Sequence, residues 1–225
     1  MILKNKQERS RWEPVKDMMG KREVLIGQHL AHQFTKSPRR ILHMMSYYKF
    51  AAKLIGKQKN VLDIGCGEGI GTWLLAVECG QANGIDTDSE AIGIGTNNWK
   101  DRRISFKCID LFKMKKKNYD AVVNFDVIEH ILPENTYRFF QKISDCLDHD
   151  GIAVIGTPNI TSDQYASPIT KAGHVNLYSG ERLEEEMKKY FHHVFLFGAN
   201  DEVVHTGFLP MAHYLIAVGC RKRKS

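Results

Sequence analysis

Short apolar runs alternate with longer segments of helical periodicity along most of the chain. Each run has the length of a strand and is bounded by glycine or polar residues, which is typical of strands buried on both faces. The predicted strands are residues 60–64, 82–86, 104–108, 121–125, 152–156, 194–197 and 214–218. The predicted helices between them are residues 71–79, 89–99, 134–147 and 180–190. This alternation predicts an α/β fold of seven strands, in a mostly parallel sheet with helices on both faces.

The two ends of the chain depart from this alternation. No helical pattern separates the last two predicted strands, so we expect the final strand to run antiparallel. Before the first strand, apolar residues recur at helical spacing from Ser37-Pro38 onward, and a helix should pack there beside the sheet. We expect a single domain over residues 37–225, and a polar, basic N-terminal extension over residues 1–36 that closes over the site as a lid. The lid candidates are Gln28, His29 and His32.

The first predicted strand runs directly into a turn in which glycines alternate with other residues, at Gly65, Gly67, Gly69 and Gly71. Glycines are needed where side chains would block a ligand or where the turn requires a positive φ. The first three follow the spacing Gly-x-Gly-x-Gly, which fits poorly with the Gly-x-Gly-x-x-Gly of NAD sites, the main alternative. The turn therefore predicts a ligand at the carboxyl end of this strand.

Two acids follow the next strands in register with this turn. Asp86 ends the second predicted strand, where a carboxylate can accept hydrogen bonds from both ribose hydroxyls, and Asp110 follows the third. With the glycine turn and the seven-strand pattern, they resemble the class I S-adenosylmethionine (SAM) methyltransferases, which have a Rossmann-like sheet. The resemblance implies SAM as cofactor, with its adenine near Asp110 and its methionine part near Asp63. The cofactor-binding residues that it implies are Asp63, Gly65, Cys66, Gly67, Asp86, Thr87, Asp110, Leu111 and Phe125.

The segment after the fourth predicted strand reads Asp126-Val127-Ile128-Glu129-His130. It resembles the Glu/Asp-x-x-Glu-His motif of ubiquinone-type O-methyltransferases and of small-RNA 3′-terminal 2′-O-methyltransferases. In the RNA enzymes this motif and a later histidine ligate a divalent ion. The resemblance implies Mg²⁺, Mn²⁺ or Fe²⁺ here, with Glu129, His130 and His174 as catalytic residues. The metal ligands that it implies are Asp126, Glu129, His130 and His174.

Two other interpretations of this segment stay open. His130 or His174 could act as a general base without a metal, or the segment could only shape the pocket. The chain also departs from the RNA enzymes, because Asp126 stands at the first ligand position and no arginine- and histidine-rich segment surrounds His174. That departure weakens the transfer of their substrate more than the transfer of their metal.

The loops expected around the acceptor are polar. Residues 160–171 are rich in Ser and Thr, and residues 200–207 contain Asn, Asp, Glu and His. Such side chains favour a sugar or another polyol over a large apolar quinone, because hydroxyls are recognised by hydrogen bonds. We therefore expect an O-methyltransferase acting on a hydroxyl of a polar small molecule, such as a sugar of a glycan or natural product. The alternatives are a quinone or catechol, an RNA 3′-terminal ribose, an amino sugar methylated on nitrogen, or a non-catalytic SAM-binding regulator.

Composition adds few constraints. The 225 residues are 43% hydrophobic and 26% charged, as in an ordinary globular protein, and no apolar run is long enough for insertion into a membrane. The polar start lacks the apolar region of a signal peptide. The five cysteines form no Cys-x-x-Cys pair, so we expect reduced thiols and a cytoplasmic location. The sequence leaves a homo-oligomer open.

The net charge of +6 raises the question of nucleic-acid binding. Part of the excess lies in two basic runs, residues 113–117 and 221–224. Neither is interleaved with aromatic residues, as a base-stacking surface would be, so we interpret them as a solvated loop and a frayed tail. Nucleic acid is therefore the less favoured partner, and a sugar-like small molecule the favoured one.

Overall fold

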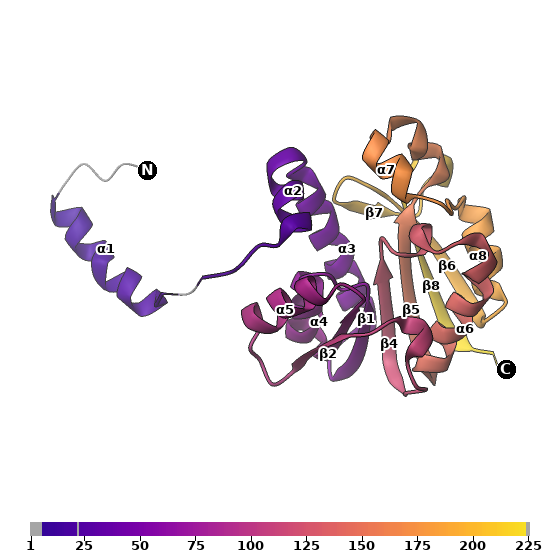
Figure 1. Cartoon of the computed structure of the whole chain (residues 1–225), viewed down its shortest axis with the longest axis horizontal. Coiled ribbons are helices and arrows are strands. Elements are labelled where there is room, and N and C mark those ends of the chain that lie inside the picture. The colour runs from indigo at the N-terminus through magenta and orange to yellow at the C-terminus, as the bar shows by residue number, and fades with distance from the viewer. Residues whose placement is uncertain (1–5, 22, 224–225) are drawn as a thin grey trace.

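One mixed sheet organises the part of the chain that the computed structural model describes, residues 6–21 and 23–223 (Figure 1). Within those residues it has eight strands in the order β3-β2-β1-β4-β5-β8-β6-β7. Strands β1 to β5 are parallel, and β8 runs antiparallel between β5 and β6, which confirms the predicted α/β class and the antiparallel last strand. The strands are β1 (Lys59–Ile64), β2 (Gly80–Asp86), β3 (Ile104–Cys108), β4 (Tyr119–Phe125), β5 (Leu147–Pro158), β6 (Phe191–Asn200), β7 (Val203–His205) and β8 (Tyr214–Lys222).

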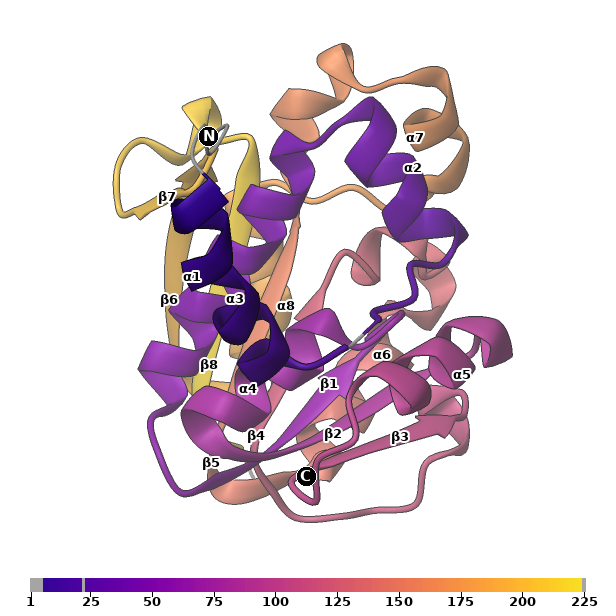
Figure 2. The same cartoon turned by 90° about the vertical axis from the view of Figure 1, so that its left-hand side faces the viewer.

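Helices cover both faces of the sheet. On one face, α3 (Arg39–Ile55) and α4 (Ile70–Cys79) bury tyrosines, alanines and Leu75 against the strands. On the other, α6 (Thr136–Cys146) and α8 (Gly180–Lys188) bury phenylalanines, Leu183 and Met187. The remaining helices are α1 (Lys6–Met19), α2 (Gln28–Lys36), α5 (Ser89–Asn98) and α7 (Pro168–Gly173). Helix α1 stands away from the sheet in Figure 1, whereas α2 and α7 lie at the same end of the sheet in Figure 2.

The prediction of seven strands was wrong by one. Residues Val203–His205 form β7, which pairs with the end of β6 across a tight turn through Asp201 and Glu202. Asp201 adopts φ 51°, a left-handed conformation that aspartate tolerates better than most residues. Three residues are too few to show an alternating pattern, so this strand cannot be recognised from the sequence.

The observed boundaries of β5 and of the helix before it also differ from the predicted ones. The predicted strand at residues 152–156 begins at Leu147, and the predicted helix before it ends at Cys146. Leu147 pairs with Tyr119 at the start of β4, before a register shift, and the next three residues are exposed. Their polar pattern therefore resembles the end of a helix more than the start of a buried strand.

The basic tail is not frayed over the residues that the structure describes. Lys222 belongs to β8 and its Nζ donates to the carbonyls of Ser144 and Leu147, at the end of α6. The amide of Arg223 donates to the Tyr190 carbonyl at 2.7 Å. The Arg223 guanidinium also donates from Nε to the carbonyl of Lys188, the last residue of α8, at 2.9 Å. Both cations thus satisfy carbonyls that helix ends leave unpaired, so at least this part of the tail is structural. Lys224 and residues 1–5 lie outside the described residues.

A buried carboxylate ties the two helices of one face to β1. Asp63 is fully buried, and it accepts hydrogen bonds from the Tyr48 hydroxyl of α3 at 3.0 Å and the Thr72 hydroxyl of α4 at 2.6 Å. Burial raises the pKa of Asp63 to about 7, and the two hydroxyls oppose that rise. The position of both helices relative to the strand end therefore depends on this one side chain.

We expect Thr72→Val to destabilise the fold more than Thr72→Ser. The valine leaves one oxygen of the buried Asp63 carboxylate without its donor, at a cost of about 1–3 kcal/mol. The serine keeps the hydroxyl and loses one methyl group, which costs about 1 kcal/mol. Urea denaturation of both variants gives the two free energies of unfolding; an equal loss would show that the hydroxyl is unimportant.

The raised pKa of Asp63 also predicts a pH dependence of stability. Between the ordinary aspartate pKa of 3.8 and about 7, the folded state keeps a proton that the unfolded state releases, so stability falls as pH rises through this window and levels off above it. Asp63→Asn should remove most of that fall between pH ~5 and ~8 in urea denaturation. Asp101→Asn is the control, because the Arg103 side chain lowers the pKa of Asp101 to about 2, outside the window. An unchanged slope in Asp63→Asn would contradict the assignment.

Candidate active site

The turn between β1 and α4 leaves an open surface at the carboxyl ends of the parallel strands. Gly65 has φ 74°, and a Cβ there would lie 2.1 Å from Val127 Cγ2. Gly67 has φ 52°, and a Cβ there would meet nothing within 4 Å, so space lies beside the turn. The Gly67 amide donates to Asp86 Oδ2 at 2.9 Å, which fixes the turn against the end of β2.

The Asp86 side chain is held by backbone amides at both of its oxygens and does not cap a helix. Its Oδ1 accepts from the Asp88 amide at 2.9 Å, and Asp88 itself caps α5 by accepting from the amides of Glu90 and Ala91. Asp88, and not Asp86, is therefore the N-cap of α5. Thr87 is exposed beside it.

The predicted residues at the ends of β3 and β4 make different kinds of contact: one caps a short helix and the other packs in the core. Asp110 accepts from the Phe112 amide at 2.8 Å and starts the short η1 helix (Leu111–Lys113), in which Leu111 is buried. Phe125 at the end of β4 is buried edge-on against Tyr48, with ring centroids 5.0 Å apart. Cys66 is buried beneath the turn, and burial raises the pKa of its thiol. The structure thus brings the ends of β1 to β4 together, with Asp63, Cys66 and Phe125 forming the buried floor and Asp86 and Thr87 nearer the surface.

The sequence interpretation missed Glu68, the one charged residue inside the glycine turn. Glu68 is only 7% exposed, because the chain before α2 lies against it: a Cβ on Gly27 would lie 2.2 Å from Glu68 Oε1. The same segment is held on α5, where the Leu25 amide donates to Asn98 Oδ1 and Asn98 Nδ2 donates back to the Leu25 carbonyl, at 3.0 and 2.8 Å. A charged residue between glycines was the only signal in the sequence for this contact.

Glu129 is a fully buried carboxylate at the start of the acceptor side. It lies in the short η2 helix (Ile128–His130) that follows β4, and its Oε2 accepts from the Thr157 hydroxyl of β5 at 2.9 Å. Its Oε1 has no hydrogen-bond partner among the described residues. Burial, and then the charge of Asp126, raises the pKa of Glu129 to about 8. A buried oxygen without a partner is rare in folded proteins, which makes Glu129 a candidate ligand-binding group.

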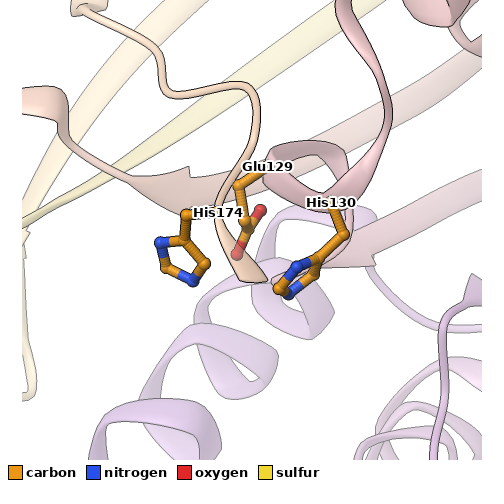
Figure 3. A group of neighbouring side chains, drawn as sticks. All are labelled: Glu129, His130 and His174. Carbon is orange, nitrogen blue, oxygen red and sulfur yellow. The ribbon is translucent and has the colours of Figure 1, made fainter. Parts of the chain in front are cut away.

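His130 and His174 stand beside this carboxylate (Figure 3). The Val175 and Asn176 amides donate to the Glu129 carbonyl at 2.9 and 3.0 Å, which brings the end of α7 against η2. His130 Nδ1 lies 2.8 Å from the Gly173 carbonyl; since a carbonyl can only accept, Nδ1 carries a proton, and in the neutral imidazole it is then Nε2 that keeps the lone pair. The two imidazole centroids are 5.2 Å apart, and burial lowers the pKa of His174.

This group has the donor set of a divalent-cation site. One ligand atom from each of Glu129, His130 and His174 lies within 4.8 Å of the others. A buried carboxylate oxygen without a partner and two imidazoles match the ligands that Mn²⁺ and Fe²⁺ accept, and the carboxylate suits Mg²⁺. The group found among the described residues does not include Asp126.

Asp126 occupies a different position at the end of β4. It adopts φ 55° and is exposed, and its amide donates to the Gly156 carbonyl of β5 at 3.2 Å. Near it lies Tyr214 of β8, which the sequence interpretation missed. Tyr214 stacks on Tyr47 with ring centroids 4.4 Å apart, and burial followed by the charges of Asp126 and Glu129 raises its pKa. The antiparallel strand β8 places this tyrosine at the active edge, which its position in the sequence did not reveal.

Comparison with known proteins supports the resemblance. Residues 32–190 match a family model described as "Methyltransferase domain". A probable S-adenosylmethionine-dependent methyltransferase of Mycobacterium tuberculosis is 25% identical over 64% of this chain and 60% of its own length. A ubiquinone biosynthesis O-methyltransferase of Rickettsia canadensis is 29% identical over 58% of this chain and 53% of its own length. The matches thus span little more than half of these curated relatives.

Solved structures share the fold. The N-methyltransferase NodS of Bradyrhizobium japonicum WM9, in complex with S-adenosyl-L-homocysteine (SAH), superposes with a TM-score of 0.63 at 18% identity, over 83% of this chain and 89% of its own. The methyltransferase domain of bacterial CtHen1 superposes with a TM-score of 0.64 at 18% identity, over 81% and 98% of the two chains. At this identity the likeness concerns the fold alone. With the family match over residues 32–190, the chain belongs to the class I SAM-dependent methyltransferases.

Proposed function

We propose that the chain transfers a methyl group from SAM to a hydroxyl of a polar small molecule, such as a sugar of a glycan or natural product. The buried, unpaired Glu129 Oε1 beside His130 and His174 carries this proposal, because it lies at the strand ends next to the glycine turn. A protein that only bound SAM would have no use for such a costly group. The RNA, quinone and amino-sugar alternatives receive no separate support from these contacts.

In this proposal the glycine turn and the ends of β2 and β3 bind the donor. The backbone of Gly65 and Gly67 lies against the methionine part, with Asp63 and Cys66 below it. Asp86, already oriented by the amides of Gly67 and Asp88, accepts from the ribose hydroxyls. The adenine lies by Asp110 and Leu111, and Thr87 and Phe125 complete the assigned set.

The acceptor hydroxyl then faces the methyl group from the side of η2. Its oxygen forms a bond to the methyl carbon while the carbon–sulfur bond of SAM breaks, and the products are the methyl ether, SAH and one proton. Such a displacement requires the three atoms in line, so positioning is the main task of the protein. His130 can take the proton at Nε2, because Gly173 holds the other nitrogen as a donor.

A divalent cation fits this arrangement of donors. Glu129, His130 and His174 would hold it, and Asp126 stays a proposed fourth ligand that the geometry leaves to one side. Such an ion lowers the pKa of a bound hydroxyl and fixes its orientation. In a metal-free enzyme the same residues would orient and deprotonate the hydroxyl.

The segment before α2 supports the proposed lid. The contacts of Gly27 with Glu68 and of Leu25 with Asn98 place α2 beside the glycine turn, so Gln28, His29 and His32 lie on a helix next to the donor site.

None of the described helices is both long and apolar enough to cross a membrane.

Gly65→Ala should abolish tight donor binding. The new Cβ meets Val127 at 2.1 Å and must adopt φ 74°, which costs about 1–2 kcal/mol before the clash is counted. We expect the Kd for SAH in isothermal titration to rise at least about 10-fold, which corresponds to 1.4 kcal/mol. Gly93→Ala in α5 is the matched control, because its Cβ would meet nothing within 4 Å. Wild-type affinity in Gly65→Ala would exclude the turn as the donor site.

Removal of divalent ions tests the acceptor site. We expect EDTA-treated protein to lose SAH formation on a panel of catechol, methyl glycosides and ribonucleosides, and to regain it with Mn²⁺, Mg²⁺ or Fe²⁺. Glu129→Gln and His174→Asn should also lose Mn²⁺ binding in calorimetry by at least about 10-fold, because each removes one ligand. His192→Asn, exposed on β6, should bind Mn²⁺ as the wild type does. If EDTA leaves activity unchanged and no Mn²⁺ binds, the metal is rejected and a histidine acting as a metal-free general base remains. If SAH binds but no hydroxylated acceptor gives a product, the chain is better explained as a non-catalytic SAM-binding regulator.

A further inference from the structure

A buried tyrosine hydroxyl at the active edge has no hydrogen-bond partner. Tyr214 is only 6% exposed, and its hydroxyl forms no hydrogen bond with any residue that the structure describes. Burying a hydroxyl without a partner costs free energy, and a phenylalanine would fill the same place without that cost. The hydroxyl therefore does not stabilise the fold, and a ligand is the partner that remains for it.

Close packing fixes the Tyr214 ring. The ring stacks on Tyr47 of α3, with centroids 4.4 Å apart and an interplanar angle of 17°. A Cβ on Gly156 of β5 would lie 2.7 Å from Tyr214 Cε1 and 2.4 Å from Phe125 Cδ1. The missing side chain at Gly156 thus makes room for both rings. Packed in this way, the ring holds the hydroxyl in one place.

The hydroxyl lies beside the acids that follow β4. Gly156 pairs with Phe125, and its carbonyl accepts from the Asp126 amide at 3.2 Å, so the Tyr214 ring adjoins the start of the acceptor segment. Burial has the largest effect on the pKa of Tyr214, and the nearby charges of Asp126 and Glu129 raise it further. The hydroxyl therefore keeps its proton at neutral pH and can donate a hydrogen bond.

Tyr214 and Glu129 approach this edge from opposite faces of β5. Successive side chains of a strand alternate between its two faces. Thr157, which donates to Glu129, belongs to one face, and Gly156, which accommodates the Tyr214 ring, belongs to the other. In agreement, Tyr214 packs in the core under α3, whereas Ile128 beside Glu129 packs in the core under α6. A ligand across the end of β5 would meet one polar group from each face.

We infer that the Tyr214 hydroxyl binds a second polar group of the acceptor, beside the hydroxyl that is methylated at Glu129, His130 and His174. This inference rests on the proposed function and adds a specificity-determining residue to it. The acceptor then carries at least two polar groups. An acceptor without the second group leaves Tyr214 unpaired in the complex, and a site built to hydrogen-bond a group discriminates against molecules that lack it.

The stability of Tyr214→Phe is the first test. We expect its midpoint of urea unfolding to be at least as high as that of the wild type, because the variant removes a buried hydroxyl without a partner. Tyr190→Phe is the matched control. Tyr190 is also 6% exposed, but its hydroxyl donates to the Tyr137 carbonyl at 3.1 Å, so this variant should unfold at lower urea. An equal loss in both variants would overturn the inference, because the Tyr214 hydroxyl would then be bonded within the protein.

Recognition of the acceptor is the second test. Phenol, catechol, pyrogallol and methyl β-D-glucoside are titrated calorimetrically with SAH present, and SAH formation from SAM is measured with each. Tyr214→Phe should bind and methylate the probes with several hydroxyls about 3- to 10-fold less well, mainly through KM, because it loses one neutral hydrogen bond. Phenol has a single hydroxyl and should respond little. Tyr190→Phe should resemble the wild type with every probe.

The outcomes separate this inference from the proposed function. If the wild type methylates a probe with several hydroxyls and Tyr214→Phe has the same kcat/KM, the transfer reaction stands and the role of Tyr214 is rejected. If Tyr214→Phe weakens the binding of such a probe and neither protein methylates any probe, Tyr214 stays a binding residue and the transfer reaction is rejected. An equal loss for phenol and pyrogallol would also overturn the inference, since phenol has no second polar group. If the wild type binds no probe, the urea comparison decides the role of the hydroxyl.

Discussion

The donor half of the site depends on one buried carboxylate. Asp63 accepts hydrogen bonds from a tyrosine of α3 and a threonine of α4, so the two helices that flank the glycine turn are tied to the strand that leads into it. The arrangement carries an energetic cost, because burial raises the pKa of Asp63 well above that of a free carboxyl group. That cost is offset only while both hydroxyls are in place. The shape of the turn around Gly65 and Gly67 follows from this constraint.

Glu129 has the corresponding role on the acceptor side, and it acts through both its backbone and its side chain. Its carbonyl receives two amides from the chain after α7, and this contact is what brings His174 to His130. Its carboxylate is fixed by Thr157 at one oxygen and unpaired at the other. The residue thus joins β4, β5 and the segment that follows α7, and one of its carboxylate oxygens stays without a hydrogen-bond partner among the described residues. A rigid group of this kind is what in-line methyl transfer requires.

Much of the fold could be read from the sequence, because most elements are long enough to show their period. The parallel strands β1 to β4 and the helices between them were predicted within a few residues. The prediction missed β7, and it placed the first residue of β5 at 152 although the strand begins at Leu147. In both cases pairing with a neighbouring strand decided the conformation of residues whose own pattern was weak or polar. The tail was also misinterpreted, since the side chains of Lys222 and Arg223 donate to carbonyls at the ends of α6 and α8, and such contacts leave no trace in local composition.

The sequence by itself determined which edge of the sheet carries the residues assigned to the donor, because they follow the ends of successive parallel strands, which meet at one edge. The glycine turn, Asp86 and Asp110 are of this kind. Only the tertiary structure decided that Asp88 and not Asp86 caps α5, that Glu68 lies under the segment before α2, and that Tyr214 enters the site from an antiparallel strand. It also decided which side chains of polar loops are exposed. Those facts depend on contacts between distant segments, and the free energy of such contacts is set by packing and not by the spacing of residues along the chain.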